Sequence, residues 1–579
     1  MSTRSQFLTL LAICTVMFWW RLGHLPLIDP DEPFYAETTR EMVQGNEWLT
    51  PTIFGERQFE KPIFFYWQSM IAMKIFGDNP FACRAPSAAA ATLLVFLTWW
   101  FGRRMFSPRA GFCAAVVLAT GVEYVLMSRL MLTDICLALC ISASVFCFWL
   151  ATEEEDKQDR LMIEGDDGVF RPEGGTEVEG KRDRWMILHF VAMAFAMLTK
   201  GPVGLLVPTI GSIGYIWLSG KRSPWRGKGL WLGILALLAI AGPWYAVMFQ
   251  KYGMEYWHRF FVHENWERLT SAEHKHSNHW YYYLMILVAG SLPWIPLVIA
   301  AVVRTVKGLK TDNRMLFMAC WFVPNLIFFT ICNSKLPTYT FFFFVTIALL
   351  MGHTLDQWIS NGFRSKGERI LASSLAVLQT VLVLGAAAVV SLILPPKESN
   401  VFIKDLVPVI YTLAAFISVP MVLLLMRRTV AWAGSTVLVT AVIVIVMQYG
   451  VDDKIPIYTS TRDIAAEAVK VRKPGEPLVT SSFIARAVTY YTGKMPEGVI
   501  FFPSTPEHVQ PYFTPHPPLK MVRGTDGLNE LAGKHTSVLC ILLSHDLAHL
   551  EIPTSPLSGR IEKLHTQGSR ILVRIKGGI

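Results

Sequence analysis

The sequence predicts a polytopic α-helical membrane protein that continues into a soluble α/β domain. Hydrophobic residues make up 52% of the chain and charged residues only 17%, whereas soluble proteins carry roughly a quarter charged residues. Apolar runs of about 18–25 residues, the length a helix needs to cross a bilayer, recur up to about residue 450 and then stop. Helices are expected for these runs because a helix satisfies its own backbone hydrogen bonds in lipid.

The apolar runs predict about thirteen membrane spans. Their ranges are 6–22, 85–101, 110–127, 132–151, 185–200, 202–219, 229–249, 281–303, 314–332, 340–358, 369–394, 405–426 and 430–449. Residues 1–450 are therefore the predicted membrane domain. It contains a first outer loop at 23–84, a cytoplasmic insert at 152–184 and a second outer loop at 250–280. Residues 451–579 are the predicted soluble domain.

The loops between the spans alternate in their content of Lys and Arg, and this alternation predicts the orientation. The basic set includes Arg103, Arg104, Lys221, Arg222, Arg427 and Arg428. The positive-inside rule places these loops in the cytoplasm together with the N-terminus. An odd number of spans then leaves the C-terminal domain in the periplasm, with the protein in the bacterial inner membrane. The net charge of +9 lies mostly in these loops, where it contacts membrane lipid, so no nucleic-acid partner is expected.

Two regions outside the spans have compositions that predict non-membrane structure. The insert at 152–184 is acidic and Gly-rich, which is typical of a mobile, solvated linker. In the soluble domain, Thr461 to Arg472 reads as a helix with Thr461 as its N-cap. Strands are expected at 477–481, 537–543 and 571–575, which together predict a small α/β domain.

Polar residues gather where the spans meet the outer surface. They are Asp29, Asp31, Glu32, Glu60, Lys61, Arg84, Asp134, Lys200, His263, Arg268, Lys335 and Tyr339. Ionisable groups cost about 2.5–3.5 kcal/mol each at the middle of a membrane helix and less near its ends. A cluster of acids and bases on one side of the membrane therefore predicts a shared polar cavity.

A lipid whose phosphate head carries a sugar would suit such a cavity. Lys and Arg side chains would hold the phosphate, which gains charge as it leaves. A carboxylate would accept the proton of the acceptor hydroxyl. No nucleotide cofactor is expected, because nucleotides are absent outside the cell and the sequence has no Walker-type loop.

The motifs in this cluster resemble a known family. The stretches Asp29-Pro-Asp-Glu-Pro-Phe-Tyr, Phe59-Glu-Lys-Pro, Arg84-Ala-Pro-Ser, Arg129-Leu-Met-Leu-Thr-Asp, Thr199-Lys-Gly-Pro and Ser334-Lys-Leu-Pro-Thr-Tyr occur in this order. Together they are similar to the 4-amino-4-deoxy-L-arabinose transferases, which modify lipid A. These enzymes are members of the GT-C superfamily and are related to protein O-mannosyltransferases.

The resemblance implies a GT-C fold and an inverting transfer of the sugar from undecaprenyl phosphate to lipid A. It implies that Asp31 is the general base and Asp134 a second functional acid, and Glu32, next to Asp31, is a further catalytic candidate. The residues implied for the phosphate and its carrier are Lys61, Arg84, Lys200, Arg268, Lys335 and Tyr339. Glu60 and His263 match positions that can hold a divalent metal ion, although two ligands do not identify a metal.

Each assignment has a plainer alternative. Asp31 and Glu32 are equally suited to capping the helix that begins near Pro33. Lys61 is a candidate for an interfacial lysine whose ammonium reaches water. Asp134 is placed to pair with Arg129, and His263 reads also as a hydrogen-bonded surface histidine.

Other functions also remain open from the residues alone. The same donor chemistry would serve a different sugar or acceptor, such as a protein or glycan. A transporter of lipid-linked sugars would carry its acids near mid-membrane, and a non-catalytic assembly factor would tolerate loss of Asp31. A single base favours one displacement, but a retaining reaction, which uses two carboxylates about 5 Å apart, would be served by Asp29 with Asp31.

Overall fold

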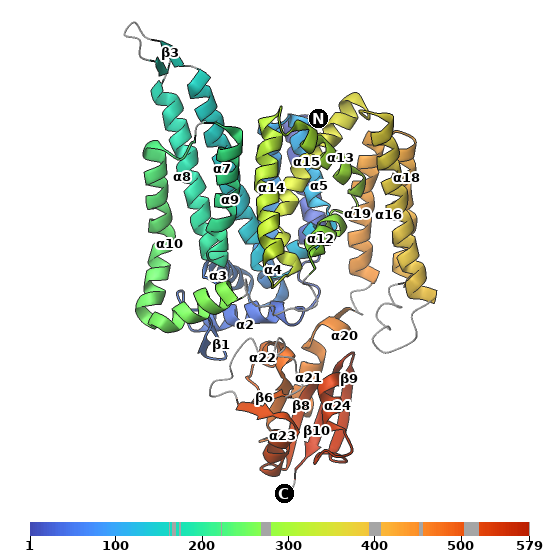
Figure 1. Cartoon of the computed structure of the whole chain (residues 1–579). Helices are drawn as coiled ribbons and strands as arrows, with labels where there is room; N and C mark the ends of the chain where they lie inside the picture. Colours follow the sequence, from blue (N-terminus) through green and yellow to red (C-terminus); the bar gives the residue numbers. More distant parts are fainter. Residues whose placement is uncertain are drawn as a thin grey trace.

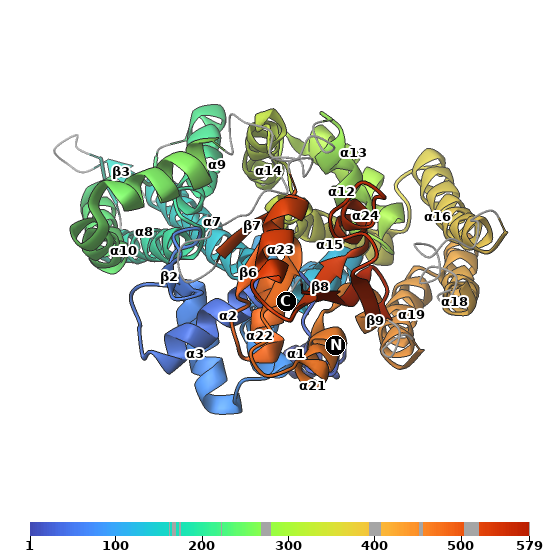
Figure 2. The same ribbon diagram turned by 90° about the horizontal axis from the view of Figure 1, so that it is seen from below.

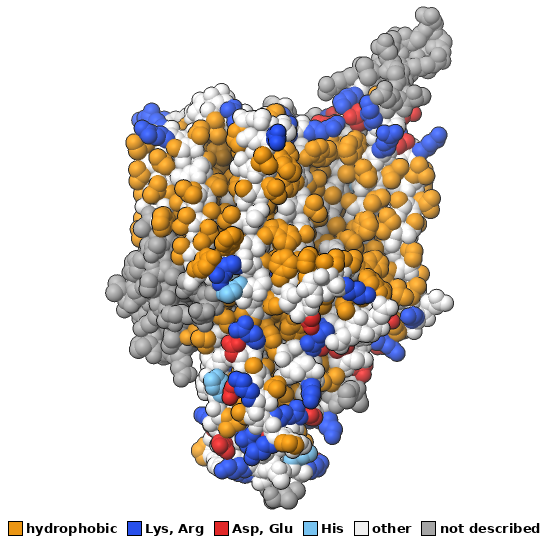
Figure 3. Space-filling model, turned by 180° about the vertical axis from the view of Figure 1, so that it is seen from behind, with side chains coloured by type: hydrophobic (Ala, Val, Ile, Leu, Met, Phe, Trp, Pro, Cys, Tyr) orange, Lys and Arg blue, Asp and Glu red, His pale blue; other side chains and the backbone are white. Residues whose placement is uncertain are grey.

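The protein is a helical body with a smaller mixed domain at one end (Figure 1). The computed structural model describes residues 1–160, 162–164, 170–172, 175–221, 223–267, 279–392, 407–450, 455–502 and 520–577. The N-terminus lies at the end of the helical body that is opposite the C-terminal domain (Figure 1). On the face that Figure 3 shows, hydrophobic side chains form a broad band across the body, with Lys and Arg along its upper edge and a more charged surface below. These features are those of a multi-pass membrane protein.

Every predicted span coincides with a helix or with a bent pair of helices. These elements are α1 (Thr3–Cys14) with the π-helical Thr15–Trp19, α4 (Pro80–Met105), α5 (Pro108–Ala119) with α6 (Val122–Ser128), α7 (Thr133–Arg160), α8 (Gly175–Lys200), α9 (Val203–Ser219), α10 (Gly227–Tyr256), α12 (Tyr282–Gly290) with α13 (Ile295–Gly308), α14 (Asn313–Ile331), α15 (Phe343–Asn361), α16 (Lys366–Leu392), α18 (Val407–Leu425) and α19 (Thr429–Gly450).

Fewer of these helices are unambiguous membrane spans. Among the described residues, six are long and apolar enough to cross a bilayer, or eight if each bent pair is one span. The pair α5 and α6 is bent by 63°, and the pair α12 and α13 by 119°. The predicted positions of the helices are therefore confirmed, while the number of crossings stays a prediction.

The first outer loop folds into α2 (Asp31–Gln44), α3 (Phe64–Phe76) and a small hairpin of β1 (Thr52–Ile53) and β2 (Glu56–Arg57). These elements lie at the end of the body nearest the C-terminal domain (Figure 1). Helix α3 ends at Gly77, whose φ of +81° favours glycine. Asn79 then caps α4, because its side chain accepts a hydrogen bond from the Ala82 N–H at 3.0 Å.

Two segments expected as loops contain regular structure. The described parts of the insert at 152–184 continue α7 and α8 and add an antiparallel pair, β3 (Met162–Glu164) and β4 (Phe170–Pro172). The second outer loop begins with a kink in α10 at Gly253, where φ is +52° and ψ is −128°, and continues as the π-helical segment Trp257–Glu267. Local helix formation therefore extends beyond the apolar runs from which the loop boundaries were predicted.

The C-terminal domain is the predicted α/β domain, with more elements than the sequence analysis recognised. Its helices are α20 (Ile455–Thr459), α21 (Arg462–Val471), α22 (Ala485–Thr492), α23 (Gly524–Gly533) and α24 (Ser544–Leu550). Its strands are β5 (Leu478–Ser481), β6 (Gly498–Phe501), β7 (Lys520–Arg523), β8 (Ser537–Leu543), β9 (Ile561–Gln567) and β10 (Arg570–Lys576). They form one sheet in the order β7-β6-β5-β8-β10-β9, in which β5 to β8 are parallel and β9 and β10 antiparallel. The predicted helix and the three predicted strands are α21, β5, β8 and β10.

The domain is joined to the first outer loop by buried polar contacts. Asp29 accepts hydrogen bonds from Arg570 of β10 at 2.7 Å and from the Thr461 hydroxyl. Thr461 therefore binds the membrane domain and makes no side-chain cap for α21. Arg40 of α2 donates to the backbone carbonyl of Tyr490 in α22 at 2.7 Å. Helices α2 and α22 lie side by side in both views (Figures 1 and 2).

Candidate active site

Two neighbouring chambers share a wall at the end of the helical body nearest the C-terminal domain, and only the larger one reaches that domain. The larger, which we call the polar chamber, has a volume of about 300 Å³ and is walled by the start of α2, the loop before α15 and α22. The smaller, the apolar chamber, has a volume of about 160 Å³ and lies between α9, α14 and the π-helical segment. Both chambers are lined by Glu60, Lys61, Asp134, Lys200, Thr338 and Tyr339. The predicted convergence of distant polar residues on one cavity is therefore present.

Asp31 occupies the first position of α2 and faces the polar chamber. Helix α2 starts there because Pro33 lies in the first turn, where its missing N–H leaves no helical hydrogen bond unmade. The N-cap is Pro30, and no described group donates a hydrogen bond to Asp31, so the capping alternative is not realised. The Asp31 side chain is exposed on the polar chamber, although protein packs around its carboxyl. Desolvation by this surrounding protein raises the pKa of Asp31 above its ordinary value, while Arg486 limits the rise.

Glu32 and Arg84 form a structural ion pair, which corrects two of the expected roles. Arg84 uses all of its N–H donors within the protein: two on Glu32, at 2.8 and 2.6 Å, and three on the backbone carbonyls of Leu22, Leu25 and Pro26. It is 3% exposed and has no donor left for a phosphate.

Glu32 is equally saturated. Besides Arg84, its two oxygens accept the backbone N–H groups of Ile28 and Met131, both at 2.8 Å. A carboxylate offers about four acceptor positions, and all are used here. Glu32 therefore ties the first outer loop to α4 and to the segment before α7, and the expected catalytic role does not fit its geometry.

Lys61 lies on the wall that the two chambers share. Its ammonium donates to Glu264 Oε2 and to the Glu60 backbone carbonyl, each at 3.1 Å. The side chain is only 12% exposed, so its head does not extend into bulk water as an interfacial lysine would. An anionic ligand in the cavity would compete with Glu264 for this cation.

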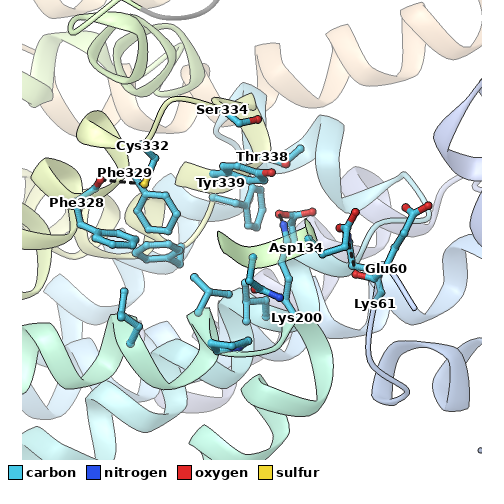
Figure 4. Close-up of a pocket in the computed structure, with 18 of the residues that line it drawn as sticks. Glu60, Lys61, Asp134, Lys200, Phe328, Phe329, Cys332, Ser334, Thr338 and Tyr339 are labelled. Atoms are coloured by element: carbon cyan, nitrogen blue, oxygen red, sulfur yellow. Dashed lines mark hydrogen bonds and ion pairs between the residues drawn. The ribbon is translucent and has the colours of Figure 1, made fainter. Parts of the chain in front are cut away.

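Asp134 and Lys200 meet on the same wall. Their side chains form an ion pair at 2.6 Å, and the Lys200 ammonium also lies 4.7 Å from the centre of the Tyr339 ring. Figure 4 shows these three residues between the charged and the aromatic sides of the cavity. The alternative pairing of Asp134 with Arg129 is wrong, because Arg129 donates instead to the backbone carbonyls of Met17 and Trp20.

Three further predicted residues are not seen to line either chamber. Lys335 is buried at 3% exposure but lines neither chamber. Arg268 lies outside the described residues, so its role stays a prediction. His263 is 59% exposed and hydrogen-bonds to Glu267 at 2.7 Å, in agreement with its alternative as a surface histidine.

The expected metal site is not supported by this geometry. Glu60 faces the chambers and pairs with Arg486 at 3.6 Å, whereas His263 does not line them. Within the described ranges, no three His, Cys, Asp or Glu side chains lie close enough to hold a metal ion. No chemical step is therefore assigned to a metal.

The apolar chamber continues from the shared wall into the helical body. Its lining includes Val203 and Leu206 of α9 and Phe328 and Phe329 of α14. Figure 4 shows Phe328 and Phe329 on the side away from Glu60 and Lys61. Such a surface suits a hydrocarbon chain, because apolar atoms gain free energy when they leave water.

Arg486 is a cavity residue that the sequence analysis missed. It belongs to α22 of the C-terminal domain, lines the polar chamber and stacks on Phe34 with 4.2 Å between the guanidinium carbon and the ring centre. No motif marks it, and it is separated from Asp31 by more than four hundred residues. Only docking of the domain brings it to the site.

The charges around the polar chamber are balanced in pairs, with one exception. Asp29 pairs with Arg570, Glu32 with Arg84, Glu60 with Arg486 and Asp134 with Lys200. Asp31 is the only lining carboxylate without an ion-pair partner within 4.0 Å among the residues that the structure describes. A carboxylate that is not neutralised is the one best able to accept a proton.

Comparison with known proteins finds sequence similarity over parts of the chain. Residues 5–260 match the family model of dolichyl-phosphate-mannose-protein mannosyltransferases. The undecaprenyl phosphate-α-4-amino-4-deoxy-L-arabinose arabinosyl transferase of Erwinia tasmaniensis is 31% identical over 332 residues, which cover 56% of this chain and 55% of that protein. The enzyme of the same name from Pseudomonas aeruginosa strain UCBPP-PA14 is 29% identical over 381 residues, or 65% of each chain. The chain thus matches between about half and two thirds of the length of these relatives.

The fold is similar over nearly the whole chain. The crystal structure of ArnT from Cupriavidus metallidurans bound to undecaprenyl phosphate superimposes with a TM-score of 0.76 and 21% identity, covering 99% of this chain and 98% of that one. The apo structure of the same protein gives a TM-score of 0.74. The chain therefore resembles these transferases in sequence over part of its length, and it has the fold of the Cupriavidus metallidurans ArnT structure.

Proposed function

We propose that this protein is an inner-membrane glycosyltransferase that moves 4-amino-4-deoxy-L-arabinose from undecaprenyl phosphate to lipid A at the periplasmic face. The observation that carries the proposal is the junction of the two chambers. A hydrocarbon-lined space and a space with an unpaired carboxylate meet at Lys61 and Lys200. A donor made of an isoprenoid, a phosphate and a sugar has the same three parts in the same order.

The donor would be divided between the chambers. Its isoprenoid chain would enter the apolar chamber between α9 and α14, and its phosphate would meet Lys61, Lys200 and Tyr339 on the shared wall. Both lysines pair with carboxylates, Lys61 with Glu264 and Lys200 with Asp134. The phosphate would take the place of Glu264 beside Lys61, so that the buried Lys61 ammonium keeps an anionic partner when the donor binds.

Transfer would proceed as one in-line displacement in the polar chamber. The acceptor oxygen attacks the anomeric carbon, the bond from that carbon to the phosphate oxygen breaks, and Asp31 accepts the proton from the acceptor. The leaving phosphate gains one negative charge, which Lys61 and Lys200 are placed to stabilise. Asp29 is occupied by Arg570, so it is not available as a second carboxylate, and inversion is expected.

The sequence similarity supports this donor, because the relatives are named for an undecaprenyl phosphate-linked aminoarabinose. A transporter is less well supported, since the acids gather at one end of the helical body, beside the C-terminal domain, and not at mid-membrane.

Mass spectrometry of lipid A tests the proposal. Lipid A from cells that express the protein should carry a pentosamine mass increment that is lost in cells carrying an Asp31→Asn variant. A different increment, or modification of another envelope component, would indicate another sugar or acceptor. Lipid A and all other envelope glycans unchanged by the wild-type protein would refute the assignment.

A further inference from the structure

We propose that the C-terminal domain completes the active site by supplying Arg486, a positioning residue that orients Glu60 and offsets the negative charge of Asp31 in the polar chamber. This inference rests on the proposed function. It gives the soluble domain a part in the reaction beyond its attachment to the membrane domain.

The position of Arg486 shows that it is built into the cavity. Its side chain is 10% exposed, and its head lies between the Phe34 ring at 4.2 Å and the Glu60 carboxylate at 3.6 Å. Burying a guanidinium at a domain interface is unfavourable unless nearby carboxylates compensate it. Here the compensating groups are themselves residues of the chamber.

Docking of α22 against α2 determines this position. Arg40, which lines neither chamber, donates to the carbonyls of Thr489 at 3.2 Å and Tyr490 at 2.7 Å. A cation at these carbonyls near the end of α22 stabilises the helix. At the other end of the pair, Arg486 approaches Phe34 near the start of α2. The two helices are therefore held together at one end by Arg40, and at the other end Arg486 enters the polar chamber that Asp31 also lines.

The electrostatic role follows from which groups surround Asp31. The charged and titratable neighbours are Glu32 and Tyr35 on α2, Glu60 and Lys61 before α3, Asp134 on α7, Lys200 on α8, Asp29 before α2, Tyr339 before α15 and Arg486 on α22. Arg486 and Lys61 favour the ionised form of Asp31, and Arg486 has the larger effect. Lys61 belongs to the shared wall, where a donor phosphate would engage it. Arg486 lies in the polar chamber alone and would continue to favour the ionised base during catalysis.

The test uses the full-length protein in lipid nanodiscs with an undecaprenyl phosphate-linked sugar and lipid A. Arg486→Gln should lower kcat by about 10–100-fold, as expected when a reacting group is misplaced, and leave the donor KM within about twofold. The acidic limb of kcat/KM should move to higher pH, because the Asp31 carboxylate loses a stabilising cation. Arg486→Lys should return the limb towards the wild-type position. The matched control is Arg462→Gln, which removes a half-exposed arginine of α21 away from the chambers and should behave as wild type.

The outcomes separate the two proposals. A wild-type protein that transfers no sugar would refute the proposed function. An active wild type together with an Arg486→Gln variant of unchanged kcat and unchanged pH profile would refute the role of Arg486. If the Arg486→Gln protein does not fold, the test uses Arg40→Gln. This variant keeps the guanidinium of Arg486 but removes the hydrogen bonds that hold α22 against α2. It should lower kcat and shift the acidic limb in the same direction, and an unaltered profile would contradict the inference.

Discussion

Replacing Asp31 by Asn should separate catalysis from folding more cleanly than any other change in the cavity. Asn has nearly the same shape as Asp but does not accept a proton at neutral pH. Asp31 has no ion-pair partner among the described residues and makes no cap for α2. The substitution therefore removes a base without leaving a buried cation unpaired.

The expected magnitudes follow from these contacts. Loss of a general base lowers a rate by about 10²–10⁴-fold. The free energy of unfolding should change by no more than about 0.5 kcal/mol, as for substitutions that break no buried contact. Glu32→Gln provides the contrast on the next residue of the same helix. It leaves the buried Arg84 guanidinium without its carboxylate and should cost about 3–5 kcal/mol.

Two measurements on each variant check the prediction. Single-turnover transfer with saturating donor reports the chemical step, and thermal unfolding of the detergent-solubilised protein reports stability. Asp31→Asn should fail in the first and match wild type in the second, whereas Glu32→Gln should unfold at a markedly lower temperature. Wild-type turnover by Asp31→Asn would remove the assigned base. An equal loss of stability in both variants would show that Asp31 is structural.

Further predictions concern the carrier site, the corrected arginine and the domain interface. Lys61→Ala should raise the donor KM by about 10–100-fold, since a hydrogen bond to a charged group contributes about 1.5–3 kcal/mol, and unchanged donor kinetics would exclude a phosphate contact. Arg84→Gln should instead lower the unfolding temperature without changing the donor KM of the folded fraction, and a raised KM would restore the carrier role. Arg570→Gln leaves Asp29 without its cation and should make the C-terminal domain more susceptible to limited proteolysis. A substitution in the exposed ion pair of Lys534 and Glu530 is the control and should leave the proteolysis rate unchanged.

Helix placement could be predicted because it depends on short-range properties. A run of apolar residues specifies a helix wherever it lies in lipid, and each predicted span coincides with one helix or a bent pair. Segments without that signal were less well predicted. The described parts of the insert at 152–184 are helical or paired strands, and the loop after α10 continues as a π-helix.

The membership of the cavity was also largely predictable, but the roles within it were not. The alternation of basic loops placed Asp31, Lys61, Asp134, Lys200 and Tyr339 at one surface, and all of them line the chambers. Their roles depend on which cation lies within about 4 Å of which carboxylate, because the interaction energy of an ion pair falls with distance and with exposure to water.

The sequence by itself therefore determined the protein class, the order of its helices and the surface on which its polar residues gather. These features depend on the length of each apolar run and on the alternation of basic loops, which are both local properties of the sequence. The tertiary structure alone decided that Arg84 forms an ion pair with Glu32 and that Arg486 reaches the cavity from another domain. It also decided that Asp31 has no ion-pair partner among the described residues. The physical reason is that these pairings join residues up to several hundred positions apart. Only the packing of α2 against α22 and its ion pair with α4 set the distances on which their charges act.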